Sequence, residues 1–191
     1  GILEGATVKN LTIGASDKDD SEFTFTATGV TSAGVFAGAM ISSTMENCVN
    51  YAPINVKGNL TDNKRTAVGG FAGYVYGAET PSNLRNLTNY GAINADPGNN
   101  TKNGGTSVMV GGVAGFSNTS SSINQMYGCV NYADMISACP RTCGILATMQ
   151  ANTTLELCKN YGDQTNSSAA RAGQITAIMG NNCLLKDCEN Y

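Results

Sequence analysis

A short pattern that recurs along the whole chain limits the possible folds more than any other sequence feature. The dipeptide Asn-Tyr occurs five times, and successive copies are 39, 42, 29 and 30 residues apart. The copies are Asn50-Tyr51, Asn89-Tyr90, Asn131-Tyr132, Asn160-Tyr161 and Asn190-Tyr191. A period of this length is typical of solenoids and other repeat architectures, in which each repeat stacks on the next.

Apolar residues occupy fixed positions before each dipeptide. The position two residues before the Asn holds Cys48, Leu87, Cys129, Cys158 and Cys188. The position three residues earlier holds Met45, Leu84, Met126, Leu155 and Leu185. A partial copy, Val8 to Ile13, begins the series. We expect both positions to form inward columns, because Cys packs as a small apolar side chain.

A glycine-rich block precedes each full copy. It is clearest at Gly69-Gly-Phe71-Ala72-Gly73 and Gly111-Gly-Val113-Ala114-Gly115, and weaker copies begin at Gly34, Cys143 and Gly173. Glycine permits a bend or a close approach of two backbones. The apolar residue in the middle of each block predicts a third inward column, made of Phe36, Phe71, Val113, Ile145 and Ile175.

The composition and the local patterns favour strands over helices. Long stretches with a period of 3.6 residues are absent, and Trp, which marks many propeller blades, does not occur. Short apolar stretches at 24–28, 68–75 and 107–110 are separated by Gly, Asn, Asp and Pro. We therefore predict an all-β fold, a parallel and right-handed β-solenoid of five to six coils, with two or three strands per coil. Equivalent residues would stack about 4.8 Å apart.

The repeats predict a single domain over residues 1–191. It would contain a partial coil at 1–27 and repeats at 28–65, 66–105, 106–139, 140–168 and 169–191. We expect loops at 57–65, 78–82 and 96–105, where the repeats differ in length. Because both ends stop inside the pattern, we expect a segment of a longer protein, with a neighbouring domain, further coils or a partner covering an end.

The Asn-Tyr dipeptide predicts two features of the surface. Asn tolerates left-handed backbone, so its column is expected at a corner, with amides that hydrogen-bond from coil to coil. The Tyr column is expected to stack as a flat aromatic strip, suited to sugar rings or to a protein partner. The candidate ligand-binding residues are therefore Tyr51, Tyr90, Tyr132 and Tyr161. The alternative is that this column only braces the coils.

Several functional classes are excluded or disfavoured by composition. The chain has no His, which removes every mechanism that needs imidazole. A net charge of −3 and a pI near 4.8 do not suit a nucleic-acid partner. No apolar run is long enough to insert directly into a membrane. Seven Cys residues cannot form a complete set of disulfides, and we expect no cofactor.

Two groups of residues are weak candidates for metal binding. The acidic cluster Asp17, Asp19, Asp20 and Glu22 offers oxygen ligands for Ca²⁺, but it lacks the Gly and distal Glu of a full calcium loop. Cys139 and Cys143 could form a disulfide, or could join Cys158 or Cys183 as thiolate ligands. We favour a solvated turn for the first group and core packing for the second.

The best-conserved blocks resemble a known repeat family. Val68-Gly-Gly-Phe-Ala-Gly and Val110-Gly-Gly-Val-Ala-Gly, each followed by Asn-Tyr-x-x-[Ile/Met], are similar to the GLUG repeats of bacterial surface proteins. The resemblance covers roughly residues 28–191. It implies an exported, cell-surface β-solenoid of Bacteroides-type bacteria that serves as an adhesin, and it supplies no catalytic residues. The export signal would lie outside this segment.

The expected function is a non-catalytic adhesin or structural stalk at the cell surface or outside the cell. Its partner would be a glycan or a surface protein. The alternative is a polysaccharide lyase or glycoside hydrolase that uses a loop-lined face, since β-solenoids host such enzymes. Its candidate residues are Asp62, Lys64, Arg65, Glu79, Arg85, Asp96 and Asp134. Nothing in their spacing selects the pair of carboxylates that glycoside hydrolysis needs.

Overall fold

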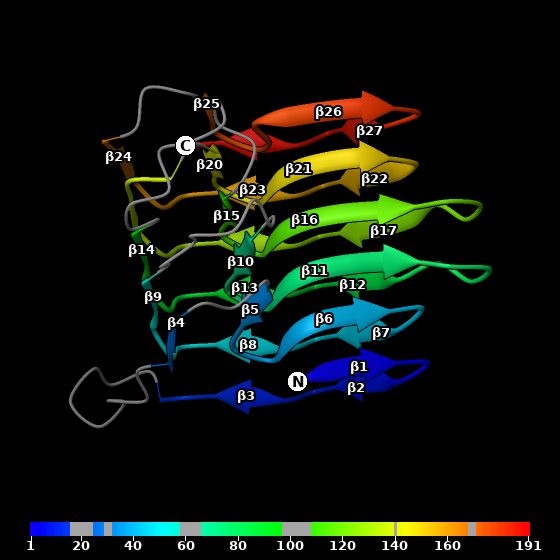
Figure 1. Cartoon of the computed structure of the whole chain (residues 1–191), viewed down its shortest axis with the longest axis horizontal. Coiled ribbons are helices and arrows are strands. Elements are labelled where there is room, and N and C mark those ends of the chain that lie inside the picture. The colour runs from blue at the N-terminus through cyan, green and yellow to red at the C-terminus, as the bar shows by residue number, and fades with distance from the viewer. Residues whose placement is uncertain (16–24, 29–31, 58–65, 97–107, 140, 168–170) are drawn as a thin grey trace.

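A computed structural model confirms the parallel β-solenoid (Figure 1). It describes residues 1–15, 25–28, 32–57, 66–96, 108–139, 141–167 and 171–191. In these ranges the chain forms 28 short strands and no helix, and therefore no helix that could span a membrane. Every strand pairs in parallel with the equivalent strands of the neighbouring coils, as the repeat predicts.

Each full coil contributes one strand to each of five parallel sheets, which we number I to V in chain order. Sheet I contains β5 (Ser32–Gly34), β10 (Thr66–Gly69), β15 (Val108–Gly111), β20 (Arg141–Cys143) and β25 (Arg171–Gly173). Sheet II contains β1 (Ile2–Glu4), β6 (Ala37–Ile41), β11 (Ala72–Gly77), β16 (Ala114–Thr119), β21 (Leu146–Ala151) and β26 (Ile178–Asn181).

The other three sheets follow in the same order around the coil. Sheet III contains β2 (Thr7–Lys9), β7 (Thr44–Glu46), β12 (Asn83–Arg85), β17 (Asn124–Tyr127), β22 (Thr153–Glu156) and β27 (Leu184–Lys186). Sheet IV contains β3 (Thr12–Ile13), β8 (Val49–Asn50), β13 (Thr88–Asn89), β18 (Val130–Asn131), β23 (Lys159–Asn160) and β28 (Glu189–Asn190). Sheet V contains β4 (Phe25–Thr28), β9 (Ile54–Lys57), β14 (Ile93–Asp96), β19 (Met135–Ser137) and β24 (Gln164–Asn166).

The expectation of two or three strands per coil is wrong, because a full coil has five. The stretch 68–75 illustrates the reason. Its apolar residues predict a continuous β stretch, but β10 ends at Gly69 and β11 begins at Ala72. The chain bends at Gly70 and Phe71 between them, and the side chain of Phe71 is buried in the core. The glycine-rich block is therefore a corner between two sheets.

The three predicted inward columns are confirmed. Their members in the middle coils are fully buried, whereas Ile175, Leu185 and Cys188 in the last coil are only partly buried. Together they form the main hydrophobic core. A second cluster, which includes Val68, Val110, Ile54, Ile93 and Met135, packs between sheets I and V. This second cluster supports sheet V from the inside.

The prediction of left-handed backbone at the Asn of the dipeptide is wrong. Positive φ angles occur instead three residues earlier, in what we call the outer column: Asn10, Asn47, Asn86, Gly128, Leu157 and Asp187. Their φ angles lie between 50° and 62°. Both positions often hold Asn, so residue type alone could not separate them.

Candidate functional site

The Asn of each dipeptide belongs to a ladder, which we call the inner column (Asn50, Asn89, Asn131, Asn160 and Asn190), and its first four members are buried. Each of the first four amides donates from Nδ2 to the Oδ1 of the Asn in the next coil at 2.8–2.9 Å, as predicted. The first four amides also donate to the backbone carbonyl two residues later, for example from Asn131 to Ala133 at 2.9 Å. These bonds fix the chain where it turns from sheet IV towards sheet V.

The second glycine of the glycine-rich block packs against this amide. A Cβ atom at Gly70 would lie 2.7 Å from the Asn89 side chain, and one at Gly112 would lie 2.5 Å from the Asn131 side chain. Gly144 and Asn160 are related in the same way. The two sequence blocks of the repeat therefore meet inside each of the three middle coils, although they are far apart along the chain.

The predicted stacking of the Tyr column is confirmed. Its ring centroids are 5.0, 4.9, 4.8 and 4.5 Å apart in order, and neighbouring planes differ by only 5–9°. The structure adds Tyr191 to the four candidates, so the tyrosine column is Tyr51, Tyr90, Tyr132, Tyr161 and Tyr191. The fifth dipeptide was the sequence signal for this residue.

The stacking determines what the tyrosine column offers to a ligand. Because the ring faces lie against one another, the surface consists of ring edges and hydroxyl groups rather than a flat strip of ring faces. Tyr90 is 45% exposed and Tyr132 is 44% exposed. Burial against the neighbouring rings, with Tyr132 and Tyr51 beside it, raises the pKa of the Tyr90 hydroxyl above its ordinary value.

An open face continues from the tyrosine column along sheet V. Alternate residues after each Tyr point outward, as their exposure shows. We call this surface the sheet V face, and its outward residues in three successive coils are Tyr90, Ala92, Asn94 and Asp96, then Tyr132, Asp134, Ile136 and Ala138, then Tyr161, Asp163, Thr165 and Ser167. The sequence pointed to the tyrosines, and to Asp96 and Asp134 as candidates for catalysis, whereas the period of two after each dipeptide indicated the others.

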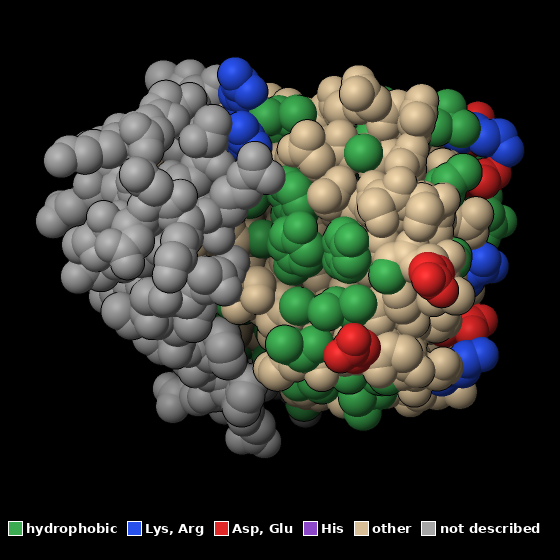
Figure 2. Space-filling view, turned by 45° about the vertical axis from the view of Figure 1, so that its right-hand side comes forward, with side chains coloured by type: hydrophobic (Ala, Val, Ile, Leu, Met, Phe, Trp, Pro, Cys, Tyr) green, Lys and Arg blue, Asp and Glu red, His purple; other side chains and the backbone are tan. Residues whose placement is uncertain are grey.

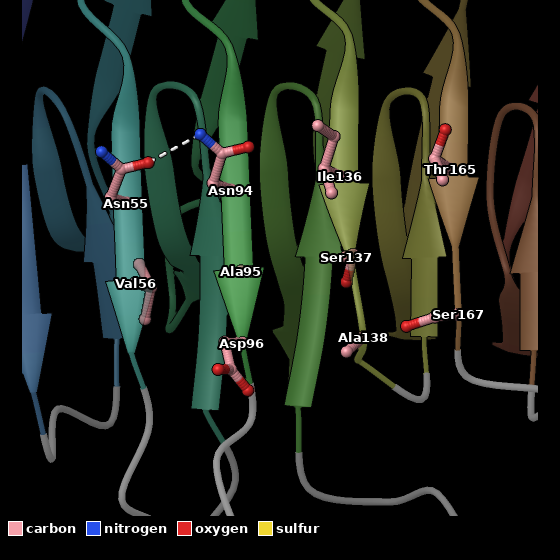
Figure 3. A pocket seen from close by; sticks show the side chains of 10 residues that line it. All are labelled: Asn55, Val56, Asn94, Ala95, Asp96, Ile136, Ser137, Ala138, Thr165 and Ser167. Carbon is pink, nitrogen blue, oxygen red and sulfur yellow. Dashed lines mark hydrogen bonds between the residues drawn. The ribbon is translucent and has the colours of Figure 1, made fainter.

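A groove of about 520 Å³ crosses the sheet V face over β9, β14, β19 and β24 (Figure 3). Asn55, Asn94, Ile136 and Thr165 form one row in register across these strands. The Asn94 amide donates to Asn55 Oδ1 at 2.7 Å. Ile136 is 60% exposed in the same row, so the groove combines amide and hydroxyl groups with an apolar side chain.

The sheet V face carries three acidic residues in the coils that follow β9. Asp96 lines the groove, and Asp134 and Asp163 lie between it and the tyrosine column. The backbone N–H of Asp163 donates to Asp134 Oδ1 at 3.0 Å. Among the described residues that line the groove, none is Lys or Arg.

The outward side of sheet III has a different character, with charges of both signs (Figure 2, right-hand edge). Lys9 pairs with Glu46 at 2.8 Å, and Lys186 pairs with Glu156 at 2.6 Å. The Lys9 ammonium holds the pKa of the Glu46 carboxyl below its ordinary value. The two partners of each exposed pair neutralise one another, so Arg85 is the one charged residue of these strands outside the two pairs.

The seven cysteines are free thiols and act as core residues. Cys139 and Cys143, the candidate disulfide, pack in two different hydrophobic clusters. Burial raises the pKa of the Cys139 thiol to about 12, which makes it unreactive at neutral pH. Within the described ranges no three Cys, Asp or Glu residues gather as a metal site. The calcium candidate, Asp17, Asp19, Asp20 and Glu22, lies outside the described residues.

The candidates for catalysis are dispersed. Glu79 lies in the exposed turn between β11 and β12, and Arg85 on sheet III donates to Gln125 at 3.1 Å. Asp96 and Asp134 share the sheet V face. The remaining three, Asp62, Lys64 and Arg65, lie outside the described residues.

No family model, curated protein or solved structure matches this chain.

Proposed function

We propose that this chain is a non-catalytic binding domain of an exported, cell-surface protein, and that it binds a neutral glycan on the sheet V face. The observation that carries the proposal is the groove of about 520 Å³, which spans four coils and has Asn94 and Ile136 at adjacent positions of one row. Sites for small ligands commonly combine an apolar surface with a few placed polar groups. A sugar ring requires the same combination, because it carries hydroxyls around its edge and C–H groups on its faces.

The charge of the face favours a neutral ligand over an anionic one. Asp134 and Asp163 would repel the carboxylates or sulfates of an acidic polysaccharide. The hydroxyls of the tyrosine column add donors and acceptors along one side of the groove, on the same outward face. The likeness of the glycine-rich blocks to GLUG repeats supports a surface location.

The groove lining supports binding without turnover. Glycoside hydrolysis uses two carboxyl groups on opposite sides of the scissile bond. Of the described residues that line the groove, only Asp96 carries one. The groove therefore fits ligand retention better than hydrolysis.

The test is a glycan array screened with the purified domain, together with assays of reducing-sugar release from the same glycans. We expect neutral glycans to bind without sugar release, and Ile136→Asp to weaken binding at least about tenfold, a change of 1.4 kcal/mol. Gln125→Ala on sheet III is the matched control and should bind normally. Sugar release, or equal loss of binding in the control, would contradict the proposal.

A further inference from the structure

The tyrosine column combines close ring contact with solvent access. Four successive ring pairs are stacked at 4.5–5.0 Å between centroids. Tyr161 is 37% exposed and Tyr191 is 66% exposed, in addition to the half-exposed Tyr90 and Tyr132. An oxidant in solution therefore has access to phenols that already touch their coupling partners.

We propose that the tyrosine column is a site of oxidative cross-linking, in which neighbouring phenols couple to dityrosine when the protein meets a haem peroxidase and hydrogen peroxide. The cross-links would join successive coils along the solenoid axis. This proposal concerns a covalent modification and does not depend on glycan binding.

The chemistry balances as follows. Each of two neighbouring phenols loses one electron to the peroxidase and one proton to water, which leaves two phenoxyl radicals. A carbon–carbon bond then forms between ring carbons ortho to the hydroxyls, and each of these carbons releases its hydrogen to the phenol oxygen by way of water. The peroxide accepts two electrons and two protons and becomes two molecules of water. The product has two hydrogen atoms fewer than the starting pair.

The geometry of the column favours coupling within it over coupling elsewhere. Radical coupling begins with contact between ring carbons of two rings, and the near-parallel stacks of Tyr90 on Tyr132 and Tyr132 on Tyr161 hold the rings in that arrangement. Groups held in a reactive geometry behave as if their local concentration were on the order of 10⁵ M or more. By contrast, the rings of Tyr74 and Tyr76 are 6.4 Å apart and tilted by 31°.

Tyr127 provides an internal control. It is 40% exposed on sheet III, close to the exposure of Tyr132, so an oxidant reaches both. Within the described residues, however, its ring stacks on no other aromatic ring. Accessibility alone predicts that Tyr127 cross-links between molecules, whereas stacking predicts that the tyrosine column cross-links within one molecule.

The experiment treats the folded chain with a haem peroxidase and hydrogen peroxide, separates monomer from dimer, and maps cross-linked peptides by mass spectrometry. We expect monomer that fluoresces as dityrosine and peptides that join Tyr51 to Tyr90, Tyr90 to Tyr132, Tyr132 to Tyr161 and Tyr161 to Tyr191. Tyr132→Phe, which keeps the ring, should remove the two middle cross-links and retain the outer two.

The control variant Tyr127→Phe should leave the dityrosine yield of the monomer unchanged. Dityrosine found only in dimers, or a monomer yield that falls with Tyr127→Phe and not with Tyr132→Phe, would overturn the proposal.

Discussion

Two columns of the repeat contain asparagine, but they differ in how many residue types they hold. The inner column is buried in the middle coils, and all five of its positions hold Asn. The outer column lies three residues earlier on the surface, and its later positions hold Gly128, Leu157 and Asp187. From the second coil onward the inner column is uniform and the outer column is not, whereas in the first coil Ile13 stands in register with Asn50.

The difference follows from what each position requires. The inner amide donates to the next amide and to a backbone carbonyl, and in most coils its Oδ1 also accepts from the coil before. No other uncharged side chain of that length has both a donor and an acceptor. The outer column requires left-handed backbone, which Gly, Asn and Asp adopt more readily than other residues. Burial of a hydrogen-bonded group therefore specifies one residue, whereas an exposed backbone conformation specifies a class.

The largest expected effect is at the inner column. Asn131→Ala removes one of the two acceptors of the Asn89 amide and the donor to the Oδ1 of Asn160, both inside the core. We expect the free energy of unfolding to fall by about 3 kcal/mol, as is typical when buried polar groups lose their partners. Urea denaturation followed by circular dichroism measures it.

The matched control for this change is Asn86→Ala in the outer column, which removes an exposed amide bond to Asn47. It should cost about 1 kcal/mol, the lower end of the roughly 1–2 kcal/mol penalty of left-handed backbone, because Asn already bears part of that penalty. An equal decrease in the free energy of unfolding for the two variants would show that burial does not distinguish the two columns.

A smaller effect of opposite sign is expected at Leu157. This residue has a φ of 54° and is 39% exposed, so its side chain gains little from packing and is strained by the backbone. Leu157→Asn should raise the free energy of unfolding by about 0.5–1 kcal/mol, because Asn tolerates this conformation. The midpoint of thermal unfolding is a sufficient measurement, and a decrease would indicate that Leu157 packs usefully.

The smallest expected effect on stability is at the tyrosine column, whose residues each directly follow an Asn of the inner column. The folded state raises the pKa of Tyr90, so its neutral phenol is favoured there more than in the unfolded chain. The resulting stability is complete below about pH 10 and is lost as the pH rises through the folded pKa. Between pH 9 and 11, Tyr90→Phe should therefore lose less stability than the parent chain. If the stabilities of Tyr90→Phe and the parent chain depended on pH in the same way, the raised pKa of Tyr90 would be contradicted.

The sequence predicted the columns whose members have a fixed offset within one block of the repeat. Columns such as Met45 with Leu84, or Tyr90 with Tyr132, follow from fixed offsets, and all of them formed as expected. The contact of Gly112 with Asn131 could not be predicted in the same way. These residues belong to different blocks, and the chain between them turns through three sheets before it brings them together.

The candidate site was only partly predictable for a related reason. The tyrosines stood out because they repeat, whereas Asn94, Ile136 and Thr165 share one row but not one residue type. A surface row has no packing requirement that would make its members alike. Their common direction became visible only when the pairing of β14, β19 and β24 was known.

The inner column also connects stability to the proposed function, because its backbone bonds hold the segment from which the sheet V face begins. The most direct test is amide NMR of the labelled domain during titration with a neutral oligosaccharide that binds on the array. We predict chemical-shift changes concentrated at Asn94, Asp96 and Ile136, with little change at Arg85 and Gln125 on sheet III. Changes concentrated on sheet III, or a bound glycan that leaves the groove residues unchanged, would contradict the central claim.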